Sequence, residues 1–388
     1  MPSKDEPVIQ LANRYSGLSM QNNIHRMVEL CPEQETPFLL MDRTAIESRA
    51  ADFVTHSKTC GVFYALKANP DPQIVRLIAS AGIGFEISAT DELDLLLGIG
   101  VDVREIITSN PVKAPGFIDR MYQLGVRRFV FDSVTEAEKI ARWAPGSDVI
   151  VRLTVENLES SWPLTDKFGI EPEEAAKLLL QSREFGLNPV GITFHVGSQC
   201  EGILSWNAAL ERAANVWHRV ALDGVELKLL NIGGGFPAYH GNDVPSVETI
   251  YGTVFKGITE LFPPNLVLEA EPGRSLVADA GVLVGSVQGK AQRDGENWLY
   301  LDIGVFNGLM EAVGKIPYQF IPLANHGNDY VKWTLAGPSC DSFDVIATDI
   351  FLPDLAVGDK LLISPGGAYT TAYASSFNGV PIPSVVVV

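Results

Sequence analysis

The sequence predicts an α/β protein, a (β/α)8 barrel joined to a C-terminal all-β sandwich or barrel domain. From residue 61 to about 282, short apolar runs alternate with amphipathic segments of helical periodicity, which is typical of βαβ units. The apolar runs are continuous, as expected for parallel strands buried on both faces. After residue 282 the chain has short strand-like runs between Gly, Pro and Asp turns, which indicates a sandwich or a small barrel.

Eight apolar runs are the expected barrel strands. Helix-like segments such as "PQIVRLIASAG", "ATDELDLLLGIG" and "PEEAAKLLLQSREFG" lie between them. Eight β-then-α units suggest a closed barrel. A doubly wound open sheet is the alternative, but it usually has fewer strands, and no G-x-G-x-x-G turn follows the first run. In chain order the runs are "VFYAL", "IGFEIS", "EIITS", "RFVFD", "DVIVRLT", "VGITFHV", "LKLLNI" and "LVLEAE".

Two domains are expected from the change of pattern. The barrel is predicted to span residues 38–282, and residues 1–37 together with 283–388 are predicted to form the β domain. The expected strands of the β domain are "GVLVGSVQGKAQ", "NWLYLDIG", "VKWTLAG", "DKLLISP" and "PSVVVV".

Composition excludes several classes of function. The 388 residues carry 29 basic and 47 acidic side chains, a formal charge of −18, which argues against nucleic acid or an anionic membrane as the partner. The four cysteines form no C-x-x-C pair and are best read as reduced thiols. Neither a signal-peptide pattern nor an apolar run of membrane-spanning length is present, so a soluble cytoplasmic protein is expected.

Polar or flexible residues stand where the eight expected strands end. In a (β/α)8 barrel this is the face that carries the catalytic groups. Each residue alone has an ordinary explanation: a histidine at a strand end is more often structural, and a glycine triplet is more often a tight turn. Eight on one rim predict an active site, and they are Lys67, Glu86, Asn110, Asp132, Arg152, His195, Gly233–Gly235 and Glu271.

The chemistry of these groups indicates a pyridoxal-phosphate site. "NIGGGFP" offers bare backbone N–H groups that can cradle a phosphate, and "EPGR" at 271–274 adds a carboxylate and a guanidinium. A buried lysine becomes a nucleophilic amine able to form a Schiff base, because desolvation disfavours its charged form. We expect Lys67 to be such a lysine and Glu271 to serve the pyridinium nitrogen. No metal site is expected.

Several long motifs occur in one order along the chain. They are "YALKANP", "HVGSQC", "NIGGGFPAYH", "EAEPGR", "GPSCDSFD" and "GAYTTAYASSFNG". With them the chain resembles the fold-type III, pyridoxal-phosphate-dependent basic amino acid decarboxylases, and among these most closely the ornithine decarboxylases. The resemblance runs from about "PFLL" to "FNGV". It implies a barrel of alanine-racemase type with a β domain, pyridoxal 5'-phosphate as cofactor, and a homodimer with shared active sites.

The resemblance also implies roles for residues around the cofactor. Lys67 forms the Schiff base, His195 stacks on the ring, and Glu271 pairs with the pyridine nitrogen. Glu86 stands where eukaryotic ornithine decarboxylases have aspartate, and Arg152 lies close to the ring. The phosphate is held by Ser198, Gly235, Gly273, Arg274 and Tyr369.

Further residues are implied for the substrate and for the second subunit. Cys340 and Asp341 come from the other subunit, where the cysteine protonates the α-carbon after CO2 leaves and the aspartate holds the distal ammonium. Glu311 lies in the loop "GVFNGLMEAVGK", which is shorter than the eukaryotic version, and stands where an aspartate usually faces the distal amine. The remaining matches are Phe377, which lines the shared pocket, and a pair that bridges the subunits, Lys167 and Asp344.

The function implied is decarboxylation of the diamino acid L-ornithine to putrescine and CO2 in polyamine biosynthesis. Decarboxylation of lysine or of meso-diaminopimelate is the alternative, although "CDSFD" and "SFNG" fit ornithine decarboxylases better than the "CES" of diaminopimelate enzymes. A non-catalytic, decarboxylase-like regulator is a third possibility, and the intact residues Lys67, His195, Glu271 and Cys340 speak against it.

Overall fold

The computed structural model describes residues 26–31, 34–164, 167–324 and 329–388. The chain divides into two compact units. The first, here called the barrel unit, consists of Ser48–Pro237 and Val244–Gly273. The second, here called the β unit, consists of the described residues of Met1–Glu47, Ala238–Asp243 and Arg274–Val388.

The barrel unit contains all eight strands that the sequence predicts, so the predicted fold class is confirmed. Every hydrogen-bonded neighbour pair in this sheet is parallel. The order is β4-β3-β2-β11-β10-β8-β6-β5, and the ring is nearly closed, with β4 and β5 at its two ends. The strands are β2 (Gly61–Ala65), β3 (Gly84–Glu86), β4 (Ile106–Ile107), β5 (Arg128–Phe131), β6 (Asp148–Arg152), β8 (Asn188–Thr193), β10 (Leu229–Asn231) and β11 (Val267–Ala270).

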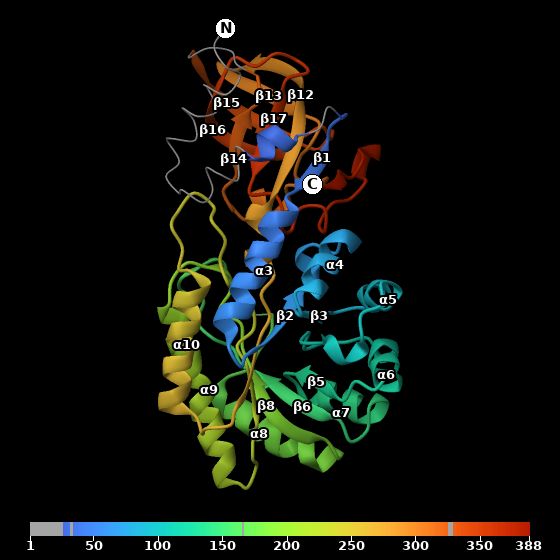
Figure 1. Ribbon diagram of the computed structural model, residues 1–388, viewed down its shortest axis with the longest axis vertical. Coiled ribbons are helices and arrows are strands. Elements are labelled where there is room, and N and C mark those ends of the chain that lie inside the picture. The colour runs from blue at the N-terminus through green and yellow to red at the C-terminus, as the bar shows by residue number, and fades with distance from the viewer. Residues whose placement is uncertain (1–25, 32–33, 165–166, 325–328) are drawn as a thin grey trace. The chain divides into compact units, whose positions relative to one another are not determined.

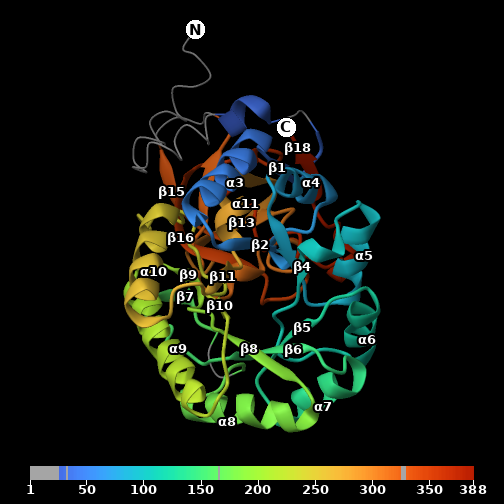
Figure 2. The same ribbon diagram turned by 60° about the horizontal axis from the view of Figure 1, so that its bottom comes forward.

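Seven helices follow seven of these strands and lie on the outside of the ring (Figure 2). Local signals in the sequence start them: Asp71 caps α4 by accepting a hydrogen bond from the Gln73 N–H at 2.8 Å, and Pro72 occupies the first helical position, where its missing N–H is no loss. None of the helices in the described ranges is long and apolar enough to cross a membrane. The seven are α4 (Pro72–Ser80), α5 (Thr90–Gly98), α6 (Pro115–Gln123), α7 (Val134–Trp143), α8 (Pro172–Ser182), α9 (Leu204–Leu222) and α10 (Val247–Leu261).

An aromatic cluster packs between the helices and the loop that follows β10. Phe236 lies 5.2 Å from Phe53 of α3 (Arg43–Ser57), 5.0 Å from Trp206 of α9 and 5.5 Å from Tyr251 of α10, measured between ring centroids. All four side chains are at most 1% exposed. Because Phe236 directly follows the glycine triplet, this cluster anchors the loop that the sequence assigned to phosphate binding.

The β unit is a sheet with the strand path β14-β17-β12-β13-β15-β16. Strand β1 (Phe38–Met41), which the sequence analysis placed in the barrel, instead pairs antiparallel with β12 and parallel with β18 in this unit, and Figure 1 shows it in blue beside β12. Strands β14 and β16 were not predicted; β16 mixes polar with apolar residues, and only three of its nine residues are buried. The other strands are β12 (Gly281–Arg293), β13 (Glu296–Leu301), β14 (Gln319–Pro322), β15 (Tyr330–Ala336), β16 (Val345–Pro353), β17 (Lys360–Ser364) and β18 (Ser384–Val387).

Candidate active site

Lys67 lies directly beyond β2, in a short 3-10 turn over Leu66–Ala68. Its Nζ donates a hydrogen bond of 2.9 Å to Oε2 of Glu86, the last residue of β3. The Glu86 side chain is buried, but 51% of the Lys67 side chain is exposed, so the expectation that Lys67 is buried is wrong. The strand ends at Ala65 and the turn carries the lysine out of the core. The position of this amine is fixed by its hydrogen bond to the buried Glu86 carboxylate.

Glu271 follows β11 and is buried, with 7% of its surface exposed. Its carboxylate accepts hydrogen bonds from the Ser109 hydroxyl and from the Asn231 amide, the latter at 2.6 Å. Burial, and after it the negative charge of Glu86, raises the pKa of Glu271 to about 7, while the two hydrogen bonds and the charge of Lys67 oppose this rise. A protonated pyridine nitrogen beside this carboxylate would stabilise its ionised form further.

Ser109 and Asn231 are site residues that the sequence analysis did not find. The Ser109 hydroxyl bonds to Glu271 and its backbone N–H lies 3.4 Å from Oε1 of Glu86, so one residue contacts both buried carboxylates. Asn231 donates to Glu271 and accepts a hydrogen bond of 2.8 Å from the Gly233 N–H. Both residues stand at strand ends. That position is the signal by which the other site residues were predicted, and it could have identified these two as well.

His195 lies two residues beyond the end of β8 and is held as a neutral imidazole. Its Nδ1 accepts a hydrogen bond of 3.0 Å from the Gly197 N–H, which places the ring proton on Nε2. Burial, followed by the positive charges of Arg152 and Lys67, lowers the pKa of His195 well below its usual value. A neutral flat ring is suited to packing against an aromatic cofactor.

The glycine triplet after β10 approaches its neighbours too closely for any side chain. A Cβ on Gly235 would lie 2.6 Å from the Gly197 carbonyl oxygen, and one on Gly234 would lie 2.7 Å from that of Glu271. Gly235 also has a φ of +101°, a conformation that favours glycine. The loop therefore lies against both "HVGS" and "EPGR", and its three glycines have no side chains to keep a phosphate from their N–H groups.

Three other predicted residues of the barrel unit lie at a strand end, in a short hairpin and in the loop that follows β11. Arg152 ends β6, where burial lowers its pKa although the carboxylates of Glu271, Asp132 and Glu86 oppose this. Ser198 begins β9 (Ser198–Cys200), which pairs with β7 (Ser160–Trp162). Gly273 is the last residue of the barrel unit.

Arg274 and Glu311 form a buried, bidentate ion pair within the β unit. The two Nη atoms of Arg274 donate to the two carboxylate oxygens of Glu311 at 2.7 and 2.6 Å, and the side chains are 3% and 4% exposed. The guanidinium carbon also lies 4.8 Å from the ring centroid of Tyr369. Glu311, expected at the distal amine of a substrate, thus has both oxygens engaged by an arginine expected at the phosphate.

Cys340, Asp341 and Phe377 belong to an exposed aromatic surface of the β unit, here called the Cys340 surface. Cys340 is exposed, and its backbone N–H donates to Oδ1 of Asn378 at 3.0 Å. Phe343 and Phe377 are 54% and 45% exposed, and both pack on Phe306, with centroid distances of 6.2 and 4.7 Å. The surface is completed by Asp341, whose Oδ1 accepts from the Phe343 N–H at 2.8 Å.

Asp344 has a structural role that the sequence did not predict. Its side chain is buried, and its two oxygens accept hydrogen bonds from the N–H groups of Val305 and Ser339 at 2.7 and 3.0 Å. The carboxylate therefore ties two loops of the β unit together. Lys167, its expected partner across subunits, is exposed in the barrel unit, with its ammonium 5.0 Å from the Phe168 ring centroid.

The residues at one barrel end define a cofactor-dependent enzyme site. They are a lysine fixed by a carboxylate, a buried carboxylate with a pKa near neutrality, a neutral histidine and a glycine cradle. The family model of the pyridoxal-dependent decarboxylases, pyridoxal binding domain, matches residues 43–278. The chain belongs to this family, and its cofactor is pyridoxal phosphate.

Relatives with known names agree with this assignment. The chain is 36% identical over 348 residues to the lysine/ornithine decarboxylase of Selenomonas ruminantium, a match that covers 89% of this chain and 87% of the relative. It is 32% identical over 404 residues to the ornithine decarboxylase of Caenorhabditis elegans, covering 98% and 94%. The crystal structure of the Vibrio vulnificus lysine/ornithine decarboxylase with cadaverine has a TM-score of 0.85 at 30% identity, covering 94% of this chain and 98% of that one.

Removal of Glu311 should destabilise the protein strongly. Glu311→Ala leaves the buried Arg274 charge without its partner, and we expect a loss of about 3–5 kcal/mol in the free energy of unfolding, measured by denaturant or thermal unfolding. Asp349→Ala, which breaks an exposed pair with Lys332, is the matched control and should cost less than about 1 kcal/mol. Equal effects of the two substitutions would contradict the buried pair.

Proposed function

We propose that the protein catalyses decarboxylation of L-ornithine to putrescine and CO2. The observation that carries the proposal is the Lys67–Glu86 pair beside buried Glu271, in a chain that matches lysine/ornithine and ornithine decarboxylases along most of its length. This arrangement provides an amine for attachment of the cofactor and a carboxylate that shares a proton with the cofactor's ring nitrogen.

Each side chain then has a defined task. When bound, pyridoxal phosphate supplies an electron-accepting ring for the electron pair released as the bond to the carboxylate breaks. Glu271 holds a proton at the ring nitrogen, and neutral His195 packs on the ring face. The proposed phosphate ligands are Ser198, Gly235, Gly273, Arg274 and Tyr369.

A homodimer with shared sites accounts for the Cys340 surface. A thiol that acts on the α-carbon must reach the cofactor, and large exposed aromatic side chains favour burial against a partner. We therefore assign Cys340 as the proton donor to the α-carbon, Asp341 as the partner of the distal ammonium and Phe377 as a wall of the pocket, all contributed to the site of a second subunit.

Lysine is the second candidate substrate. A relative is named lysine/ornithine decarboxylase, and a related enzyme has been crystallised with cadaverine and with putrescine. Glu311 does not exclude lysine by its length, because Arg274 already holds both of its oxygens. Meso-diaminopimelate fits less well, because its second carboxylate would meet Asp341. A non-catalytic regulator would not need the Lys67–Glu86 pair.

Covalent attachment of the cofactor should depend on Lys67. The purified protein should absorb in the visible range with pyridoxal phosphate, and borohydride should fix the cofactor to Lys67 in a peptide map. Lys67→Ala should abolish attachment and lower kcat at least about 1,000-fold, whereas the exposed Lys177→Ala should leave both unchanged. A reduced adduct on another lysine would overturn the site assignment.

The substrate assignment is tested by kcat/KM for ornithine, lysine and meso-diaminopimelate. We expect ornithine to be preferred over lysine by about 10- to 200-fold, the range for one methylene in a fitted pocket, and meso-diaminopimelate to be rejected. Glu311→Asp should not raise the preference for lysine if Glu311 serves Arg274. A wild-type preference for lysine would establish the second candidate instead.

Sharing of sites between subunits is tested by complementation. Lys67→Ala and Cys340→Ala subunits are each expected to be inactive. Mixed under conditions of subunit exchange, they should recover up to about a quarter of wild-type activity, because half of the subunits are then in heterodimers and each heterodimer has one intact site of two. Mixed subunits that exchange, as shown by a tag, without recovery of activity would place each site within one chain.

A further inference from the structure

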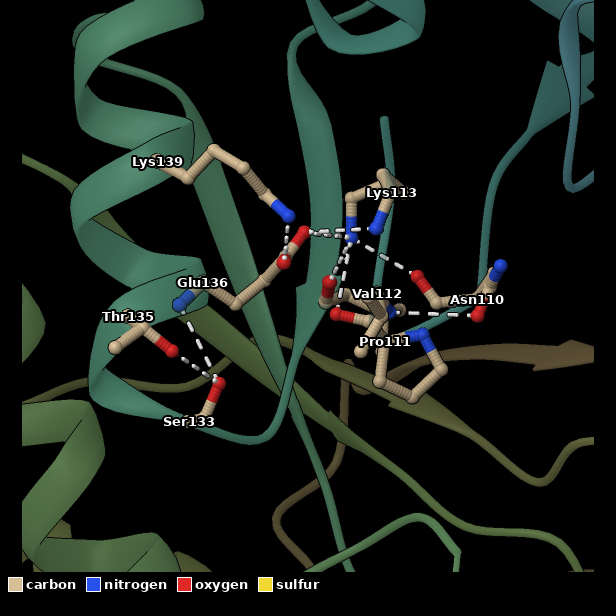
Figure 3. Close-up of polar contacts among 9 residues, drawn as sticks. Asn110, Pro111, Val112, Lys113, Ser133, Thr135, Glu136 and Lys139 are labelled. Atoms are coloured by element: carbon tan, nitrogen blue, oxygen red, sulfur yellow. Dashed lines mark hydrogen bonds and ion pairs between the residues drawn. The ribbon is translucent and has the colours of Figure 1, made fainter. Parts of the chain in front are cut away.

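Lys113 is a lysine with a fully buried side chain that the proposed chemistry does not use. Its side chain is 0% exposed, and its Nζ donates to the carbonyl oxygens of Asn110 and Val130 at 2.9 and 2.5 Å. The same atom lies 3.1 Å from Oε1 of Glu136, which also accepts the Lys113 backbone N–H at 3.2 Å. Figure 3 shows the ammonium between the Glu136 carboxylate and the Asn110 segment.

These contacts cross the gap between β4 and β5, the two strands at the ends of the barrel sheet in the part of the chain that the structure describes. Strand β5 has a ladder to β6, and β4 has one to β3, and these two strands end the sheet order. Lys113 follows β4 in the chain, whereas Val130 lies in β5 and Glu136 lies in α7. Its ammonium therefore provides a donor to an edge-strand carbonyl where a neighbouring strand would otherwise provide a backbone N–H.

The Glu136 carboxylate is itself fixed from several sides. Ser133 caps α7 by accepting the Glu136 N–H at 3.3 Å, and Lys139, one turn further along α7, places its Nζ 2.5 Å from Oε2. The Glu136 side chain is 2% exposed. A buried acceptor that is anchored in this way defines one position for the Lys113 ammonium, and with it the path of the chain before Lys113.

That path carries Ser109, the residue that touches both Glu86 and Glu271. Lys113 follows Ser109 by four positions, and the carbonyl of Asn110 between them is bound by the Lys113 ammonium. Movement of this segment would withdraw the Ser109 hydroxyl from Glu271 and its N–H from Glu86.

We propose that Lys113 is a positioning residue that closes the seam between β4 and β5 and thereby holds Ser109 on the two carboxylates of the cofactor site. Its role in catalysis rests on the proposed function; its role at the seam does not. The ammonium acts entirely through the chain segment and through Ser109, and touches neither cofactor nor substrate.

The two roles of Lys113 are separated by two measurements on Lys113→Met, with Lys139→Met as the matched control. Lys139 also binds Glu136 but makes no contact across the seam in the described structure. Hydrogen exchange of peptides covering residues 106–114, in the protein without added cofactor, tests the seam. We expect at least about tenfold faster exchange in Lys113→Met, since the bonds of the ammonium to two carbonyls and one carboxylate are lost, and no change in Lys139→Met.

The second measurement is the pH midpoint of pyridoxal-phosphate affinity. Glu271 is faced by Glu86, Lys67 and Arg152, and the Ser109 hydrogen bond lowers its pKa against the effect of burial. Loss of that bond raises the pKa of Glu271, so the ionised form that pairs with the ring nitrogen appears at higher pH. Lys113→Met should move the midpoint upward by about 0.5–1 pH unit, Ser109→Ala should do the same, and the double variant should show no further shift.

Each result decides between the alternatives. Unchanged exchange in Lys113→Met would overturn the seam role, and faster exchange with an unchanged pH midpoint would overturn the link to Ser109. If Lys113→Met does not fold, Glu136→Gln provides the same two tests, with the same direction and a smaller size expected. If the wild-type protein fails to bind the cofactor, the proposed function fails, while the exchange experiment still decides the seam role.

Discussion

The buried carboxylate of Glu271 is the constraint on which the barrel end depends. Burial makes its ionised form unfavourable, and the negative charge of Glu86 adds to this. The surrounding residues act to offset that effect: Ser109 and Asn231 donate hydrogen bonds to it, and Lys67 supplies a positive charge nearby. What remains is a pKa of about 7, so that a basic ring nitrogen bound beside it can complete the neutralisation. The ionised form of Glu271 thus stays incompletely stabilised, and a cationic ring beside it would stabilise that form.

Glu271 also ties the chemistry to the architecture. Asn231, which binds Glu271, also accepts the N–H of Gly233, and a Cβ on Gly234 would lie only 2.7 Å from the Glu271 carbonyl oxygen. The aromatic packing of Phe236 holds the other end of this loop. The hydrogen bond from Gly233 to Asn231 and the aromatic packing of Phe236 therefore define the conformation of the glycine loop together. Neither would do so alone, because the hydrogen bond fixes only the first glycine and the packing only the residue after the third.

Regular patterns in the sequence predicted the barrel. They did not predict the contacts between residues that lie far apart in the sequence. The eight strands and their order of βα units follow from continuous apolar runs, but "FLLM" at 38–41 has the same pattern in either unit, and only its pairing with β12 and β18 decides. Lys67, Glu86, His195 and Glu271 were singled out because ionisable side chains at strand ends are conspicuous in the sequence. Ser109 was missed because its role arises from a contact with a residue 162 positions away, and nothing in the local sequence distinguishes it from an ordinary strand-end serine.

The Glu311–Arg274 pair shows why residue type alone is a weak guide to specificity. A carboxylate near a diamino acid is naturally assigned to the distal ammonium, and its length then appears to set the length of the substrate. Buried against Arg274 with both oxygens occupied, Glu311 could serve an ammonium only by leaving a guanidinium without its partner in the interior, which is strongly unfavourable. Asp341 is exposed, and the N–H of Phe343 binds one of its oxygens. Under the proposed function, selection between ornithine and lysine is therefore to be sought at the Cys340 surface and not in the buried ion pair.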